Sequence, residues 1–372
     1  MPIPVTRLGD RGPVVAEIRD RLTRVTLLPH PDGSAAGPPP DDAVFDDHVD
    51  RAVRTFQQLR GITVDGVVGP QTFRRLEEAR WRLGDRVLSY TPGHLTAGDD
   101  VLELQRRLSG FGFDCGRADG VFGVLTDGAL RDFQRNVGAE ADGTCGPQTF
   151  KALARLTRAI TPGGQPEALR EQLSLTSVRT GVADKVVVLD PGHGGPEPGH
   201  SASGLRECDV AADIAVRVEG RLAAIGTQVL LTRATGPELP GDAVDESVRA
   251  AFANDTGADL VLSLHTDAVR SPLPNGAASF YYGEPTGGVF SLTGHHLAEL
   301  VQEEVCGRTD LQDCRSHPRT WDLLRLTRMP AVRVELGYLS HPGDASRLAD
   351  ASFRDVLAEG LATAISRFFA PD

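Results

Sequence analysis

The first half of the chain is a repeat. Residues 52–76 pair without a gap with residues 129–153, at an offset of 77 positions. The shared letters include an Asp-Gly dipeptide, at Asp65–Gly66 and Asp142–Gly143, followed in both copies by Gly-Pro-Gln-Thr-Phe. Asp-Gly specifies a turn and proline favours the first position of a helix, so each copy is expected to end in helix, turn and short helix. This repetition restricts the first half to two small domains of one kind.

Upstream of this match, each copy carries one more helical pattern. The apolar positions there correspond at an offset of 86, with Val15, Ile18 and Leu22 matching Val101, Leu104 and Leu108. The first copy therefore holds nine additional residues, and the Pro- and Gly-rich stretch LPHPDGSAAGPPP predicts an insertion near 28–43. Each copy is predicted to be a small all-α three-helix bundle, the first over residues 1–90 and the second over residues 91–158.

After residue 158 the repeat stops and the period of the sequence changes. A Pro-Gly-Gly stretch predicts a linker over residues 159–183. From 184 to 370, the runs KVVVLD, QVLLT, ADLVLSLH, ASFYYG and AVRVELGYL alternate with helical patterns near 207–224, 246–255, 291–305 and 344–368. Strands that are apolar throughout and separated by helices predict an α/β domain, with a mostly parallel sheet and helices on both faces.

Composition and charge exclude several classes of protein. The net charge of -12 argues against binding to nucleic acid or to anionic lipid surfaces. No run of about 18 apolar residues occurs, so no membrane span is expected. The N-terminal stretch lacks the apolar core of a secretory leader, which predicts a cytoplasmic protein, or a cell-wall protein if an upstream leader was removed. The five cysteines form no CxxC pair and are expected to be free thiols.

Four groups with metal-binding or acid–base chemistry occupy comparable places in the second half. His193 follows the first predicted strand, Glu207 begins a predicted helix, and His265 and Glu335 end the runs ADLVLSLH and AVRVE. Groups at the carboxyl ends of parallel strands converge at one edge of a sheet. Two imidazoles and a carboxylate can hold a metal and leave a position free for water, from which a second carboxylate takes a proton. The pattern predicts a hydrolytic zinc site; iron(II) accepts the same ligand types, although its oxygenases use all-β barrels and closely spaced ligands.

These motifs carry a family resemblance that covers residues 184–370. DPGHGG, the helix GLRECDVAADIAV, SLHTDA and PAVRVELGYLSHP resemble the zinc-dependent N-acetylmuramoyl-L-alanine amidase family, also called amidase type 3. The resemblance implies that His193, Glu207 and His265 are the Zn²⁺ ligands and that Glu335 is the catalytic carboxylate. It also implies hydrolysis of the amide bond between the lactyl group of muramic acid and L-alanine of the peptidoglycan stem peptide. Through their Phe-Gln pair and DGxxGPxT turn, both repeats resemble the peptidoglycan-binding domain family.

Some positions depart from the usual pattern of that amidase family. Cys208 stands where members commonly have Lys, Thr266–Asp267 where they have Ala-Asn, and His341 where they have Asn. None of these positions is an implied metal ligand, so the departures are expected to bear on substrate binding and turnover. Asp267 and His341, together with His200, which lies close in sequence to the motifs, are the candidates for contacts with substrate.

A second interpretation keeps the scaffold and gives it another role. The chain is similar to leaderless actinobacterial members of the amidase family, which have been tied to the control of precursor synthesis. This similarity predicts a cytoplasmic regulator or sensor that binds peptidoglycan or its precursors and hydrolyses them weakly or not at all. Its partners would be a cytoplasmic peptidoglycan-biosynthesis enzyme and a serine/threonine kinase.

Overall fold

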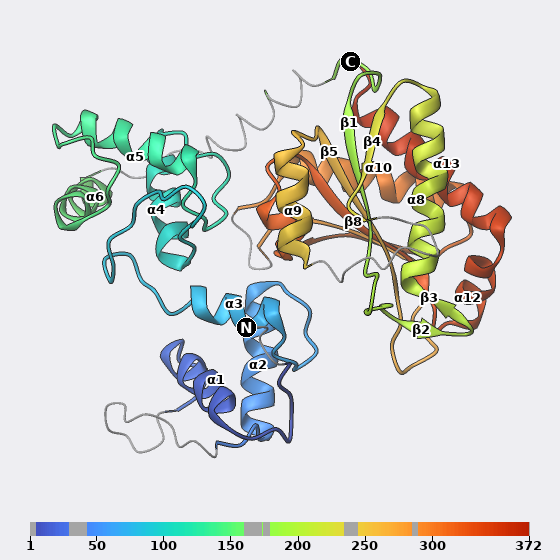
Figure 1. The fold of residues 1–372 in the computed structure, drawn as a ribbon, viewed down its shortest axis with the longest axis horizontal. Coiled ribbons are helices and arrows are strands. Elements are labelled where there is room, and N and C mark those ends of the chain that lie inside the picture. Colours follow the sequence, from blue (N-terminus) through green and yellow to red (C-terminus); the bar gives the residue numbers. More distant parts are fainter. Residues whose placement is uncertain are drawn as a thin grey trace. The chain divides into compact units, whose positions relative to one another are not determined.

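A computed structural model shows that the 372-residue chain forms two compact units, residues 1–169 and 170–372 (Figure 1). The structure describes residues 5–29, 43–159, 173, 179–233, 245–284 and 289–371. Most of the predicted insertion near 28–43 and most of the predicted linker over 159–183 lie outside the described residues. Within the described part, none of the helices has the length and apolar character needed to cross a bilayer.

The N-terminal unit is all α, with two sets of three helices, as the repeat predicts. The helices are α1 (Pro13–Arg24), α2 (Asp47–Arg60), α3 (Pro70–Glu78), α4 (Asp99–Gly110), α5 (Val124–Asn136) and α6 (Pro147–Ala159). Proline begins α3 and α6, where its fixed backbone angle suits the first helical turn. Each set has its own apolar core, which in the first contains Phe45 and Phe56 and in the second Phe122 and Phe133.

A buried glutamine holds each Asp-Gly turn against the helix that precedes it. The Gln57 amide donates to Asp65 Oδ1 at 2.8 Å and to Thr72 Oγ1 at 3.2 Å, and its oxygen accepts from the Gly66 amide at 2.9 Å. The same contacts recur 77 residues later around Gln134. The identical positions of the repeat therefore build one polar network twice, in which a buried side-chain amide is satisfied by the turn it holds.

A third copy of this network, which the sequence repeat did not reveal, surrounds Gln105. Gln105 on α4 donates to Asp119 at 2.9 Å and to Thr126 at 3.1 Å, and accepts from the Gly120 amide at 2.8 Å. The position equivalent to Gln105 in the first bundle is Arg19, which instead donates to the Val44 carbonyl and the Asp46 carboxylate. The second bundle thus carries the network twice, around Gln105 and Gln134, and the first bundle carries it once, around Gln57.

The C-terminal unit is built on a six-stranded sheet. Its strands are β1 (Val186–Pro191), β4 (Gln228–Leu231), β5 (Leu260–Asp267), β6 (Ala277–Tyr282), β7 (Asp313–Arg319) and β8 (Ala331–Tyr338). In the order β4-β1-β5-β8-β6-β7, every pair is parallel except β6 with β8. The predicted mostly parallel sheet is confirmed. A small hairpin of β2 (Ser201–Ala202) and β3 (Leu205–Arg206) precedes the first helix of this unit.

Helices cover both faces of the sheet and give them different characters. The helices are α8 (Glu207–Ala224), α9 (Glu246–Asp255), α10 (Leu292–Arg308), α11 (Asp322–Leu326), α12 (Pro342–Ala349) and α13 (Ala351–Phe368). One face packs its aliphatic side chains, such as Leu189, Leu262 and Val334, against α8, α10 and α13. Figure 1 shows α9 on the opposite side of the sheet from α8. On that opposite face the strand positions near the carboxyl ends are polar, and they include Asp190, Ser263, His265, Arg333 and Glu335.

Some elements differ from the sequence prediction. The helix expected over 344–368 is two helices, because Asp350 ends α12 and its carboxylate caps the first turn of α13 through the Ser352 amide. Strand β7 and helix α11 were not predicted. Strands β5 and β8 extend two and three residues beyond His265 and Glu335, so these residues lie within strands and not at their ends.

Candidate metal centre

Three predicted ligands come together at the carboxyl edge of the parallel strands. Among the described residues, one ligand atom from each of His193, Glu207 and His265 lies within 4.8 Å of the others. His193 Nε2 is 3.3 Å from Glu207 Oε2, and His265 Nδ1 is 2.8 Å from Glu207 Oε1. Donors that hold zinc tetrahedrally at 2.0–2.1 Å stand about 3.3 Å from each other. Two imidazoles and a buried carboxylate at this spacing fit a zinc ion.

A buried arginine holds the loop that carries His193. His193 has a positive φ of 57°, which is uncommon outside glycine. Arg249 of α9 donates to the His193 carbonyl at 2.8 Å and pairs with Asp190 of β1 at 2.6 Å. Asp190 also accepts from Ser263 and Thr232, so its carboxylate is fully engaged. The loop conformation is therefore fixed by contacts from α9, from strands β1 and β5, and from Thr232, the residue that follows β4.

Two glycines make room for the ligand side chains. A Cβ at Gly192 would collide with the His265 ring. Gly199 has a φ of +69°, and a Cβ there would lie 2.6 Å from both Glu207 Oε2 and the His193 ring. Gly192 and Gly199 of the DPGHGGPEPGH stretch thus allow the close approach of backbone to the three ligands.

The carboxylate of Glu207 governs the charge of the centre. Burial by itself would raise the pKa of Glu207, but hydrogen bonds and charge from both imidazoles hold this pKa well below its usual range. His193 is also desolvated, yet its contacts with Glu197 and Glu207 raise its pKa to about 9. Burial and the nearby charge of Arg333 lower the pKa of His265 to about 4. In the metal-free centre, His193 carries the proton and His265 is neutral.

Glu335 lies beside this group on the neighbouring strand. It is opposite His265 in the register of β5 and β8, and only 7% of its surface is exposed. Its Oε1 accepts two hydrogen bonds from Arg333, at 2.9 and 2.7 Å, whereas Oε2 is buried and has no hydrogen-bond partner among the described residues. Burial raises the pKa of Glu335 to about 7, with Arg333 opposing the shift and the charges of Glu207 and Asp267 adding to it. A carboxyl group with this pKa can accept and return a proton near neutral pH.

The three weaker candidates have different surroundings. His200 Nε2 lies 3.7 Å from Asp267 Oδ1, with both side chains partly exposed, and the His200 backbone amide donates to Glu207 Oε2 at 2.9 Å. His341 is occupied otherwise, because its Nδ1 accepts from the Asp344 amide and caps the start of α12. His200 and Asp267 therefore border the ligand group, and His341 has a structural task.

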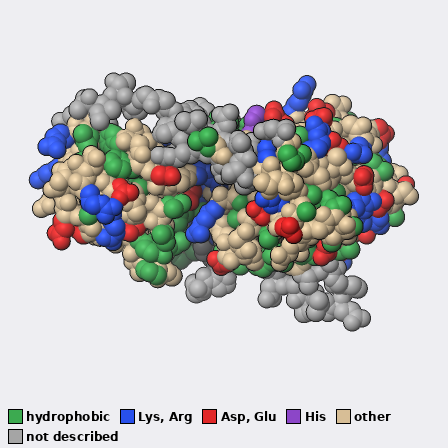
Figure 2. Space-filling view, turned by 90° about the horizontal axis from the view of Figure 1, so that it is seen from above, with side chains coloured by type: hydrophobic (Ala, Val, Ile, Leu, Met, Phe, Trp, Pro, Cys, Tyr) green, Lys and Arg blue, Asp and Glu red, His purple; other side chains and the backbone are tan. Residues whose placement is uncertain are grey.

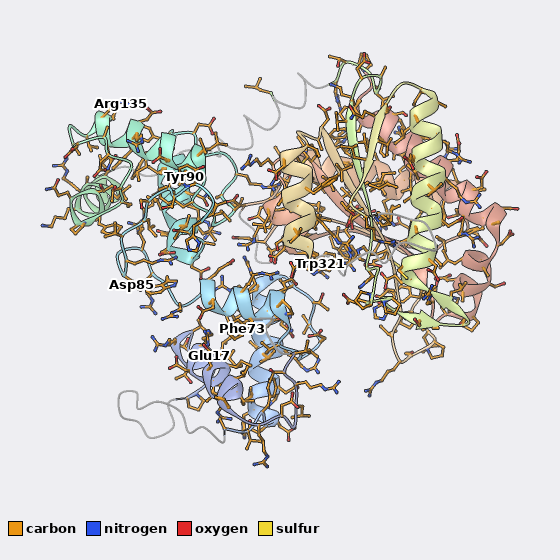
Figure 3. All side chains as sticks on the ribbon, in the orientation of Figure 1. Glu17, Phe73, Asp85, Tyr90, Arg135 and Trp321 are labelled. Atoms are coloured by element: carbon orange, nitrogen blue, oxygen red, sulfur yellow. The ribbon has the colours of Figure 1, made fainter. Side chains whose placement is uncertain are left out.

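Several residues of the site were missed from the sequence. Arg249 and Asp190 support the ligand loop, and Arg333 with Glu246 supports Glu335. Trp321, labelled in Figure 3, stacks its ring 4.5 Å from the Arg333 guanidinium. The sequence did contain one signal of this support. Arg333 stands between two valines of a predicted buried strand, and a buried arginine needs a partner. The identity of that partner was not readable from the pattern.

Charges of both signs are interspersed on the surface. On the face drawn in Figure 2, basic and acidic side chains are interspersed, and the described residues of that face show no extended basic patch.

All five cysteines are free, as predicted, and Cys115, Cys145 and Cys208 are buried.

Comparison with known proteins identifies both halves of the chain. Residues 187–367 match the family model described as N-acetylmuramoyl-L-alanine amidase. Residues 11–76 and 97–153 match that of a putative peptidoglycan binding domain, which confirms the repeat.

One relative covers nearly the whole chain, and others cover half of it. It is 45% identical to the N-acetylmuramoyl-L-alanine amidase CwlM of Mycobacterium tuberculosis, over 98% of this chain and 89% of that relative. It is 30% identical to the germination-specific N-acetylmuramoyl-L-alanine amidase of Bacillus subtilis, over 50% of this chain and 81% of that relative. Among solved structures, AmiC2 of Nostoc punctiforme matches with 30% identity and a TM-score of 0.45, covering 50% of this chain and 98% of that one. The chain belongs to the N-acetylmuramoyl-L-alanine amidase family.

Proposed function

We propose that the protein hydrolyses the amide bond between the lactyl group of muramic acid and L-alanine of a peptidoglycan stem peptide. The observation that carries this proposal is the pairing of a three-donor group with a buried carboxylate on the adjacent strand. That pairing is suited to hydrolysis, because one part can hold a metal and the other can move a proton. Membership of the amidase family names the bond.

In this proposal His193, Glu207 and His265 hold one zinc ion. Three protein donors leave a tetrahedral ion one further position, as in other catalytic zinc sites. When bound, the ion supplies Lewis acidity to water and to the scissile carbonyl. His193 gives up its proton when the ion binds, and Glu207 remains ionised because its pKa lies far below neutrality.

Glu335 is the proton carrier. Its Oε2 has no other partner among the described residues and is the oxygen that accepts a proton from the attacking water. The same carboxyl group then delivers this proton to the departing amine of L-alanine, so that one residue acts first as base and then as acid. The products are a glycan with a free lactyl carboxylate and a free stem peptide.

The two N-terminal bundles hold the enzyme on peptidoglycan. Their family match supports this role, and a tethered domain meets its insoluble substrate at a raised effective concentration. The regulatory alternative, with a biosynthesis enzyme and a serine/threonine kinase as partners, stays a prediction, as does the cytoplasmic location.

The test combines metal analysis with cleavage of a defined muramoyl peptide by wild type and Glu335→Gln. We expect one equivalent of zinc in both proteins, cleavage by wild type, and a loss of at least about a hundredfold in the variant, since general base catalysis contributes about 10²–10⁴. Zinc without cleavage by wild type would contradict the enzyme and favour the regulator. Cleavage by the variant at near the wild-type rate would remove Glu335 from the mechanism.

A further inference from the structure

Glu335 is the end of a chain of three charged side chains that crosses from α9 to β8. Arg333, two residues before Glu335 on β8, points to the same face of the sheet and donates from Nε and Nη2 to Glu335 Oε1. Its Nη1 donates to Glu246 Oε1 at 3.2 Å. Glu246 Oε2 in turn accepts from the Leu323 backbone amide at 3.3 Å, which ties the chain to α11.

The guanidinium is held from a second direction by an aromatic ring. Arg333 lies 4.5 Å from the ring of Trp321, and only 7% of that tryptophan is exposed. Three charge-assisted hydrogen bonds and a stacked ring leave the planar guanidinium little freedom to turn. Because Nε and Nη2 of Arg333 both donate to Oε1, the Glu335 carboxylate has one occupied oxygen and one buried oxygen without a hydrogen-bond partner among the described residues.

We propose that Arg333 is a positioning residue for the hydrolytic reaction, which binds Oε1 of Glu335 and thereby reserves Oε2 for the transferred proton. The proposal rests on the role of Glu335 given above. Lysine cannot replace this geometry, since the compact ammonium group does not offer two N–H groups fixed in one plane to a single carboxylate oxygen.

Glu246 makes the arrangement stable in both protonation states of Glu335. With Glu335 ionised, Arg333 lies between two carboxylates. When Glu335 takes up a proton, Arg333 still has Glu246 as its counter-ion, so no unpaired charge is left buried. A single Arg333–Glu335 pair would lack this property, because protonation would leave the guanidinium alone in a largely buried place.

Arg333 can also act against the reaction, and the test distinguishes this effect from positioning. A guanidinium beside Glu335 also weakens the carboxylate as a base, and its charge acts on His265. If this effect dominates, removal of the arginine speeds cleavage. If positioning dominates, removal slows cleavage although the carboxylate becomes a stronger base.

The kinetic experiment uses the full-length, zinc-loaded protein and compares Arg333→Met, Arg333→Lys and Glu246→Gln. We expect Arg333→Met to lower kcat about a hundredfold with KM and zinc content unchanged, because a catalytic group misplaced by about 1 Å loses that much rate. Glu246→Gln keeps the Arg333–Glu335 contact and should lower kcat less than Arg333→Met does. Arg333→Lys retains the positive charge but not the two planar N–H groups, so its kcat should lie between those of Glu246→Gln and Arg333→Met. Arg217→Met is the matched control, since it removes an arginine paired with Asp213 on α8 and should leave kcat unchanged.

A second measurement separates this inference from the proposed function. Crystal structures of zinc-loaded wild type and Arg333→Met show the orientation of the Glu335 carboxylate whether or not the protein cleaves. A carboxylate that turns or loses order in the variant supports positioning; one that keeps its orientation overturns it. With an active wild type, unchanged or raised kcat in Arg333→Met also overturns it. An inactive wild type would contradict the proposed function. The two crystal structures would still show whether Arg333 positions the Glu335 carboxylate.

Discussion

At the scale of single residues, the site is a set of ionisable groups whose protonation is divided by environment. Glu207 and Glu335 are both buried carboxyl groups. Glu207 is ionised because two imidazoles contact it, whereas the pKa of Glu335 rises to about 7 because burial outweighs its single arginine partner. Different tasks for two similar groups follow from their partners, in the way that enzymes commonly separate a fixed charge from a proton carrier.

The pKa of Glu335 predicts an acid limb in the pH profile of kcat. The carboxyl group must be ionised to accept a proton, so kcat is expected to rise with pH and to level off above about 7. A bound cation favours the ionised form, which moves the midpoint below that of the metal-free protein. Measuring kcat by steady-state kinetics between pH 4.5 and 8.5, which covers on the order of two units to each side of the midpoint, checks this dependence. A flat profile over that interval would contradict the assignment.

The pKa of His193 predicts that zinc binding depends on pH. Its value of about 9 means that the metal-free protein holds a proton on this ring at neutral pH, which zinc must displace. Apparent zinc affinity should therefore increase by about tenfold per pH unit up to about pH 9 and then level off. Competition with a chelator of known proton affinity measures it. Equal affinity at pH 6.5 and 8.5 would show that His193 is not the displaced group.

At the scale of elements, glycines and turns bring distant ligands together. Gly199 lies in the loop before the β2–β3 hairpin, and any side chain there meets Glu207 and His193. We expect Gly199→Val to lose zinc while the sheet remains folded, because the disturbance is confined to the ligand loop. Elemental analysis and circular dichroism check the two parts. As the control, Gly204→Val also changes a glycine with positive φ, but its added carbon meets open space.

The glutamine networks predict where the N-terminal bundles are most sensitive. Gln134→Leu removes the partner of the Gly143 amide and of Asp142, and it should lower the free energy of unfolding by about 2 kcal/mol. Arg135→Ala, at the exposed neighbouring position, should cost much less because surface ion pairs contribute little. Thermal unfolding of both variants measures the difference. Equal losses would mean that the buried network is not the source of stability.

At the scale of the whole molecule, the segments that match the putative peptidoglycan binding domain and the segment that matches the amidase model lie in separate compact units. Deletion of residues 1–160 should therefore spare cleavage of small soluble muropeptides. It should weaken binding to whole sacculi, because the two bundles would no longer hold the enzyme on the wall. Co-sedimentation with sacculi and a soluble-substrate assay give the two readings. Undiminished sedimentation of the shortened protein would remove the targeting role of the bundles.

The sequence alone predicted the fold class of both halves and four residues that lie close together in the structure. Periodic apolar runs and turn residues are local signals, and they predicted the repeat, the mostly parallel sheet and the convergence of His193, Glu207, His265 and Glu335. Only the tertiary structure decided how these residues are supported. Arg333 meets Glu246 across 87 positions, and Arg249 meets Asp190 across 59. Such pairs leave no local pattern, because a buried charge specifies that it needs a partner and not where in the chain that partner lies.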